Sequence, residues 1–259
     1  MSRLNVFMVV ILSLIVAANI GMAQGIYITA NVGYSLGAGT QILGANSSYT
    51  GTTHNVEVIC GSLGEGFKFG ASAGYMFNQN LGTELGLSYW PGKTFESISE
   101  AGPTAFTELY SGSGFVAVPS IVVSAGMTTI NPYARFGVVL GILNVKHELR
   151  DVGPAQTAVY TMEETGSLAF GYAGALGVVI PAGSAVDLFA EVGLHSVTYS
   201  PSHEELTGYT VNGVDRLATI TEKVVEYKDS YTSDAQNTTM AVRRPFSSIG
   251  IVVGARINL

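Results

Sequence analysis

The chain has few charged residues, a single cysteine and no long apolar run after its first 23 residues. Aspartate, glutamate, lysine and arginine make up 12% of the 259 residues, whereas soluble domains carry about 25%. Cys60 has no second cysteine with which to form an internal disulfide. A membrane-spanning helix needs about 20 apolar residues, and residues 24–259 contain no such stretch. These shortages exclude a disulfide scaffold and a helical membrane protein, and they disfavour a soluble domain.

Acidic residues outnumber basic ones, which excludes a further class of partner. The net charge is −7, whereas binding to nucleic acid needs clustered lysine and arginine. No metal-ligand spacing, phosphate-binding loop or nucleophile elbow is present. The sequence therefore predicts no nucleic-acid partner, no cofactor, no metal site and no catalytic residue. One enzymatic alternative stays open, because His203 lies beside Ser202 and Glu204, residue types that could form a hydrolase or acyltransferase site.

The apolar residues, 47% of the chain, follow a period of two. This period places successive side chains on opposite faces of a β-strand. The last strand has one apolar face, formed by Ile249, Ile251, Val253, Ala255, Ile257 and Leu259. Its other face is mainly glycine, with Arg256 and Asn258. Only helices and closed barrels satisfy every backbone polar group in lipid, so the alternation predicts a closed membrane β-barrel.

The same alternation predicts eight antiparallel strands, at residues 26–36, 66–77, 81–90, 115–124, 133–145, 168–180, 186–199 and 246–259. Short connections at 78–80, 125–132 and 181–185 alternate with long ones at 37–65, 91–114, 146–167 and 200–245. Short turns on one side and long loops on the other are typical of an outer-membrane barrel. Residues 217–227 alternate within the last long loop. They predict a hairpin above the membrane or an extra strand pair, which would give ten strands.

Aromatic side chains mark the two expected membrane interfaces, where such rings prefer the headgroup level. Those expected on the lipid face near the outer rim are Tyr34, Phe67, Tyr89, Phe115, Phe170 and Tyr172. Tyr75 and Phe77 are expected near the inner rim.

Residues 1–23 have the composition of a secretory signal peptide. Arg3 supplies a positive start, residues 6–18 are apolar apart from Ser13, and residues 21–23 are small enough for cleavage. We therefore predict a signal peptide at 1–23 and a single barrel domain at 24–259.

Taken together, these features resemble the small outer-membrane β-barrel family, which includes the eight-stranded outer-membrane proteins A and X. The segment 131–141, which opens with Asn131, Pro132 and Tyr133 and continues with spaced glycines, looks like one strand of that family. The resemblance implies a bacterial outer-membrane location, contact with membrane lipid and lipopolysaccharide, and the barrel-assembly machinery as a partner during insertion. The family usually ends on an aromatic residue, whereas Leu259 ends this chain.

Several charged residues fall on inward faces, where a narrow lumen requires them to be paired. Four are predicted at similar heights above the short turns and would form one neutral layer: Glu84, Arg135, Asp187 and Arg256. Glu191 is predicted to lie higher, with Lys68 and His195 towards the outer rim. We interpret this network as a structural plug, because eight strands enclose an interior just wide enough for side chains. A conducting or gated lumen is the alternative.

The predicted function is accordingly non-enzymatic. The barrel would serve a structural, adhesive or ligand-binding role, and an extracellular ligand or surface protein would contact its outer loops. The first alternative is a small pore. The second is an outer-membrane lipid-modifying enzyme or protease.

Overall fold

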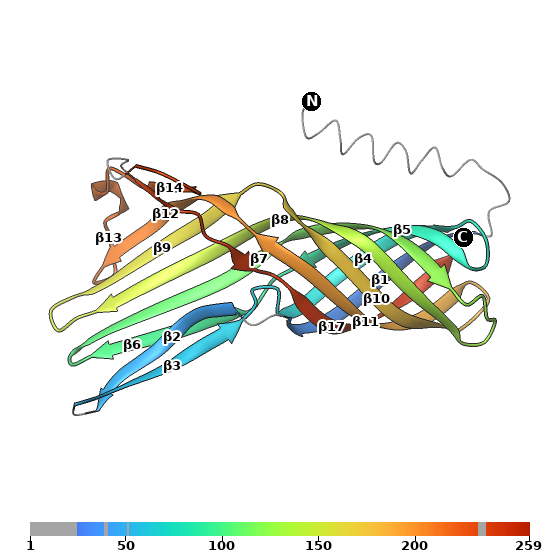
Figure 1. The fold of residues 1–259 in the computed structure, drawn as a ribbon, viewed down its shortest axis with the longest axis horizontal. Coiled ribbons are helices and arrows are strands. Elements are labelled where there is room, and N and C mark those ends of the chain that lie inside the picture. Colours follow the sequence, from blue (N-terminus) through green and yellow to red (C-terminus); the bar gives the residue numbers. More distant parts are fainter. Residues whose placement is uncertain (1–24, 39–40, 51, 233–236) are drawn as a thin grey trace.

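The computed structural model describes residues 25–38, 41–50, 52–232 and 237–259, so the predicted signal peptide lies outside the described residues. Eight strands form a closed antiparallel barrel (Figure 1). In barrel order they are β1 (Gly25–Gly37), β4 (Gly66–Met76), β5 (Leu81–Trp90), β7 (Thr104–Ser124), β8 (Asn131–Val152), β10 (Ala169–Pro181), β11 (Val186–Tyr199) and β17 (Ser248–Asn258). β17 pairs with β1 and closes the barrel. The predicted eight strands are confirmed, and the ten-strand alternative is wrong.

The remaining elements belong to the long loops and lie beyond one end of the barrel (Figure 1). They are β2 (Gln41–Thr50), β3 (Thr53–Gly61), β6 (Thr94–Ala101), β9 (Thr157–Gly166), β12 (Pro201–Val211), β13 (Val214–Asp215), the 3-10 helix η1 (Leu217–Thr219), β14 (Val224–Lys228), β15 (Thr238–Met240) and β16 (Arg244–Pro245). The alternating segment 217–227 thus contains η1 and most of β14. β14 pairs with β12 outside the barrel.

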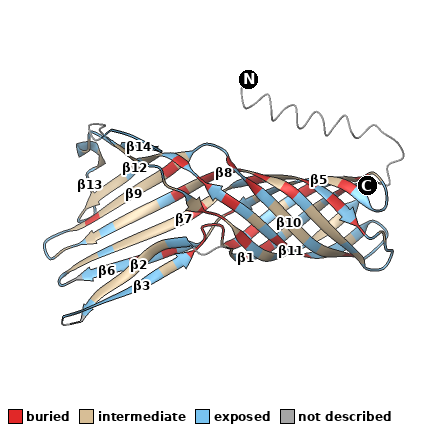
Figure 2. Cartoon of the chain, in the orientation of Figure 1, coloured by how far each residue is buried: buried red, intermediate tan, exposed pale blue. Residues whose placement is uncertain are grey.

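The outward faces of the barrel strands carry the predicted apolar residues. Leu176 is 70% exposed and Phe136 is 62% exposed, and similar side chains follow on every barrel strand. Figure 2 shows exposed and buried residues alternating along the barrel. A continuous exposed apolar belt around a closed barrel is stable only against lipid, so the barrel is a membrane-embedded structure. No helix in the described ranges is long and apolar enough to cross a membrane.

The aromatic residues predicted at the outer rim are exposed on the lipid face and contact one another. Tyr34 meets Phe67 with ring centroids 5.1 Å apart, and Tyr89 meets Phe115 at 5.0 Å. Phe170 and Tyr172 are both more than half exposed. At the other rim, Tyr75 and Phe77 pack edge to face at 5.4 Å.

Two barrel strands are longer than the sequence predicts. β7 and β8 remain paired up to Ala105 and Val152, far beyond the apolar belt. The outward face of β8 is apolar up to Ile142 and then carries Asn144 and Lys146. Once a strand leaves the lipid its outward face becomes polar, so the alternation that identified the strand is lost although its backbone pairing continues.

Candidate functional site

A buried ion-pair network crosses the lumen at the level of Arg135. This side chain comes from β8 and reaches Glu84 on β5 and Glu191 on β11. One guanidinium nitrogen contacts Glu84 Oε1, and the other lies 2.5 Å from Glu191 Oε1. The glutamates are 8% and 5% exposed. A planar guanidinium can contact two carboxylates at once, so one arginine ties together three strands that do not pair with one another.

Two tyrosines satisfy the remaining carboxylate oxygens. The hydroxyl of Tyr27 donates to Glu84 Oε2 at 2.8 Å, and that of Tyr133 donates to Glu191 Oε2 at 2.7 Å. A glycine on a neighbouring strand makes room for each ring, because a Cβ at Gly74 or Gly177 would overlap it. Four strands and two glycine gaps therefore hold the carboxylates in place.

Lys68 completes the charge balance of this part of the lumen. Its Nζ donates to Ser248 Oγ at 2.5 Å, lies 3.8 Å from the centre of the Trp90 ring and is 3.5 Å from His195 Nδ1. Within the described part of the chain it forms no ion pair. A cavity of about 60 Å³ lies between Lys68 and the Arg135 network and touches both. Counted together, Lys68 and Arg135 balance the two glutamates, although Lys68 stands apart from them.

Asp187 and Arg256 form a separate group near the short-turn end. They face each other across β11 and β17, with Arg256 Nε 3.8 Å from Asp187 Oδ2. Asn258 lies between them and bonds to both, at 2.9 Å and 2.8 Å. The contacts thus divide the predicted four-member layer in two. Strands in a barrel are tilted and staggered, so residues at equal distances from their turns do not lie at equal heights.

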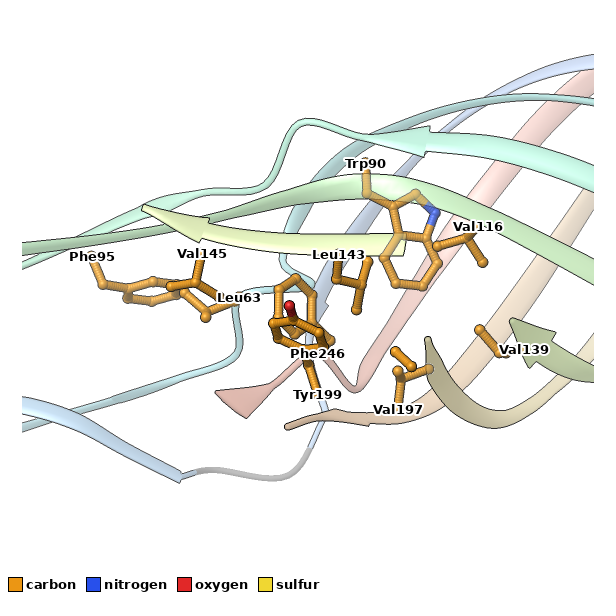
Figure 3. Close-up of a cluster of buried hydrophobic side chains, with 11 residues drawn as sticks. Leu63, Trp90, Phe95, Val116, Val139, Leu143, Val145, Val197, Tyr199 and Phe246 are labelled. Atoms are coloured by element: carbon orange, nitrogen blue, oxygen red, sulfur yellow. The ribbon is translucent and has the colours of Figure 1, made fainter. Parts of the chain in front are cut away.

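Buried apolar side chains from the barrel strands and the loop ends pack together, and we call this cluster the apolar plug (Figure 3). Its buried members are Leu63, Trp90, Phe95, Val116, Val139, Leu143, Val145, Ala169, Val197, Tyr199 and Phe246. Leu63 and Phe246 come from the loop ends before β4 and β17 and are 1% and 0% exposed. Sequence reasoning missed this cluster. Its signals were Trp90 and the valines on the inward faces of the predicted strands, together with Phe246, which was predicted to begin the last strand. Leu63 reaches the cluster from a predicted loop.

A second polar cluster, which we call the loop clamp, lies above the plug. It consists of Tyr110, His147, Glu164, Glu204, Tyr227 and Arg244. Arg244 Nε donates to Glu164 Oε2 at 2.8 Å, and Glu164 is fully buried. Tyr227 donates to Glu164 and Glu204 at 3.4 and 3.3 Å, and His147 Nδ1 lies 3.2 Å from Glu204. The clamp joins β7, β8, β9, β12, β14 and β16, and nothing in the sequence pattern brings these six segments together.

The environment of the loop clamp shifts the pKa of several of its groups, among them Tyr110 and Glu204. Burial raises the pKa of Tyr110 to about 12. Burial also raises the pKa of Glu204, but hydrogen bonds from His147 and Tyr227 and the nearby Arg244 charge outweigh it, so this pKa lies below its usual value of 4.5. A carboxyl group with a depressed pKa stabilises the folded state above its unfolded pKa. This stabilisation is lost as the pH falls through the folded pKa.

We therefore expect Glu204→Gln to make the attachment of the last long loop to the barrel less dependent on pH. In the unchanged protein, loop residues 200–245 should become more sensitive to an acid-active protease as the pH falls below 4.5. The variant should be cleaved at a rate that changes less with pH. Glu205→Gln, on an exposed neighbour, is the matched control and should behave as wild type. Identical pH profiles for wild type and Glu204→Gln would contradict the assignment.

The enzymatic alternative depends on the histidines. His203 lies between two hydroxyls, 3.1 Å from Ser202 Oγ and 2.9 Å from Thr165 Oγ1. In the described segments it forms no ion pair with a carboxylate, and a catalytic triad requires one to orient the base. His147 has a carboxylate partner, Glu204, but within the described ranges no serine, threonine or cysteine is in hydrogen-bond contact with it. Among the described residues no group of three His, Cys, Asp or Glu could hold a metal ion.

The comparisons with known proteins supply a fold relationship only. No protein-family model matches the chain, and no curated protein matches it. Among solved structures, Neisserial surface protein A is similar at 14% sequence identity, with a TM-score of 0.40. The match covers 92% of this chain and 100% of that protein. By its closed strand order and its apolar outer belt, the chain has the fold of the small eight-stranded outer-membrane β-barrels.

Proposed function

We propose that this chain is a sealed, non-enzymatic barrel of the bacterial outer membrane that acts through the sheet it extends above the lipid. The observation that carries the proposal is the combination of a lumen blocked at two levels with strands that continue beyond the membrane. The barrel serves as the rigid support, and an extracellular ligand or surface protein contacts the loops. Binding sites commonly lie on loops held by such a scaffold.

The blocked lumen supports a scaffold over a pore. The Arg135 network spans the interior at one level, and the apolar plug fills it at the next. An ion passing through would have to displace Phe246 and Leu63, which are fully buried, and then break buried ion pairs. Dispersed charges alone would have been compatible with a conducting lumen, but an apolar plug is not.

The extended sheet supports a role at the cell surface. β6, β7, β8, β9 and β12 are hydrogen-bonded in sequence above the lipid belt, and the β2–β3 hairpin lies next to β6. β3 pairs only with β2 within the described residues, and Val56 and Val58 on it are more than half exposed. Such an edge is suited to contact with a partner.

A conductance measurement separates the scaffold from the pore. The refolded chain, reconstituted into a planar bilayer, is expected to show no discrete current steps, because both blocks lie on the only path through the barrel. Heat-modifiable migration on a gel serves as the control that the inserted protein is folded. Stable unitary steps from the folded protein would contradict the sealed scaffold and make Arg135 and Lys68 candidates for an ion filter.

Loss of the hairpin tip tests the surface role. Replacing residues 47–58 by a short glycine–serine linker removes the exposed tip with Val56 and Val58 and retains Leu43 and Ile59, which pack against the plug. Both proteins, held in nanodiscs, would be screened on protein and glycan arrays. A signal lost in the variant supports binding through the loops. A signal of equal strength from both proteins, or none from either, would count against this hairpin as the contact.

The same proposal names the molecules that contact the barrel in the membrane and during insertion. Membrane lipid and lipopolysaccharide contact the apolar belt and its aromatic rims, and the barrel-assembly machinery inserts the folded strands. The enzymatic alternative is tested by incubating the reconstituted protein with phospholipid. We expect no product with wild type, His147→Ala or His203→Ala, whereas hydrolysis lost in either histidine variant would favour an enzyme.

A further inference from the structure

A vestibule of about 360 Å³ lies in the barrel below the Arg135 network. Residues at its short-turn end include Asn78, Gln79 and Met127, and Arg135 and Glu191 lie at its inner end. Its volume falls within the range of about 300–1,000 Å³ typical of small-molecule sites. Neither the blocked lumen nor the surface role proposed above requires an open space here.

Arg256 is held in the wall of this vestibule in a fixed orientation. Its guanidinium lies 3.8 Å from the centre of the Tyr27 ring, a distance typical of a cation–π contact. Its Nε donates to Asn258 Oδ1 at 2.9 Å. Contacts on the ring face and at Nε leave the two terminal nitrogens without a hydrogen bond in the described part of the chain. A guanidinium oriented in this way presents two parallel donors.

The carboxylate that pairs with Arg256, Asp187, makes only a long contact with it. Asp187 lies 3.8 Å from Arg256 Nε and accepts a closer hydrogen bond from Asn258, at 2.8 Å. Asp187 is not part of the vestibule lining, whereas Arg256 is. The side-chain carboxylates in the lining, Glu84 and Glu191, already accept bonds from Arg135 and a tyrosine each. Arg256 is therefore a charged group of the vestibule whose terminal nitrogens have free bonding capacity within the described part of the chain, and that capacity suits an anion.

The other residues that line the vestibule indicate which chemical group the ligand carries in addition to its anionic group. Six apolar side chains contribute to it, and we call them the apolar wall: Met76, Val122, Met127, Val179, Phe189 and Leu259. Met76, Val122 and Val179 are less than 10% exposed, so the surface that this wall offers to a ligand lies mainly on its other members. A purely polar anion would leave this wall in contact with water, whereas a short hydrocarbon chain would cover it.

We propose that the vestibule binds a small amphipathic carboxylate entering from the short-turn side. The carboxylate accepts two hydrogen bonds from the terminal nitrogens of Arg256, and the hydrocarbon part lies against the apolar wall. The bound molecule stops at the Arg135 network, so this is a binding site and not a step in transport.

Hexanoate tests the proposal, with hexanol as the probe that lacks the charge and inorganic phosphate as the anion that lacks the chain. Binding to the full barrel in zwitterionic nanodiscs would be measured by titration, with the Arg256 Nε–H signal followed by nuclear magnetic resonance. We expect saturable hexanoate binding that shifts this signal, and weaker binding of both other probes. Hexanol binding as tightly as hexanoate would overturn the charge recognition. Phosphate binding as tightly would overturn the role of the apolar wall.

Two variants with opposite expected effects complete the test. Arg256→Met should weaken hexanoate binding at least about ten-fold, as expected for loss of a charged hydrogen-bond pair. Arg216→Met, which changes an exposed loop arginine, should leave it unchanged. Asp187→Asn removes the competing carboxylate and should tighten binding, which keeps the proposal testable if Arg256→Met does not fold. Equal affinity in all three variants, or no saturable binding to wild type, would overturn it.

Discussion

Replacing Arg135 by methionine should lower the unfolding temperature of the detergent-folded barrel more than any other single substitution of a charged lumen residue. The variant leaves Glu84 and Glu191 buried with only a tyrosine hydroxyl each. Removing one partner of a buried ion pair costs about 3–5 kcal/mol, and here two carboxylates lose the same partner. Heat-modifiable gel migration and a denaturant titration of the folded fraction would measure the loss.

The matched control is Arg256→Met. Arg256 lies 3.8 Å from its carboxylate, and its side chain is 21% exposed, so solvent screens the pair and the loss should be clearly smaller. Combining Arg135→Met with Glu84→Gln and Glu191→Gln should recover part of the lost stability, because neither residue 84 nor residue 191 then carries a buried charge without a partner. If Arg135→Met and Arg256→Met unfold at the same temperature, Arg135 does not hold the network.

Replacing Phe246 by alanine should detach the last long loop from the barrel. Phe246 is fully buried in the plug and packs edge to face against Tyr199, with ring centroids 6.0 Å apart. Truncating a buried phenylalanine costs about 3–5 kcal/mol. The loss acts on the returning end of the loop, which is otherwise held by the loop clamp and the short β16 pairing, whereas β12 stays paired with β9. Limited proteolysis should cut within residues 200–245, while the barrel keeps its heat-modifiable migration.

Two further variants separate plug packing from a general effect of losing an aromatic ring. Phe106→Ala removes a side chain that is 39% exposed above the lipid and should leave protease resistance unchanged. Gly112→Val adds volume to the plug, because a Cβ at this glycine would lie 2.7 Å from the Phe246 ring. Overpacking costs about 1–3 kcal/mol, so this variant should also expose the loop. A protease-resistant Phe246→Ala would show that the plug does not hold it.

The strands in lipid were predictable, because a bilayer imposes a simple rule on them. Each outward side chain must be apolar, and this produces the period of two in β1, β4, β5, β10, β11 and β17. The rule ends where the lipid ends. β7 and β8 were therefore predicted to be about half their observed lengths, and strands such as β9 and β12 were read as loop.

The sequence predicted which charged side chains lie in the lumen, but it did not predict which of them contact one another. Alternation places Glu84, Arg135, Glu191 and Lys68 on inward faces. It does not indicate which of them meet, because strand tilt and stagger determine the height of each side chain. Arg135 was expected in one layer with Glu84, Asp187 and Arg256. It contacts Glu84 and also Glu191, which was expected higher, while Asp187 shares Asn258 with Arg256.

The sequence by itself determined that this chain forms an eight-stranded barrel in a membrane, which side chains face lipid, and which charges lie inside. These properties depend on neighbouring residues along one strand, and periodicity records them. Only the tertiary structure decided which charges pair, that Leu63 and Phe246 are buried in the apolar plug, and that six loop segments meet in the loop clamp. Such contacts join residues that are far apart in the chain. They depend on the stagger of the barrel strands and on loops that return to the barrel, and no local pattern encodes them.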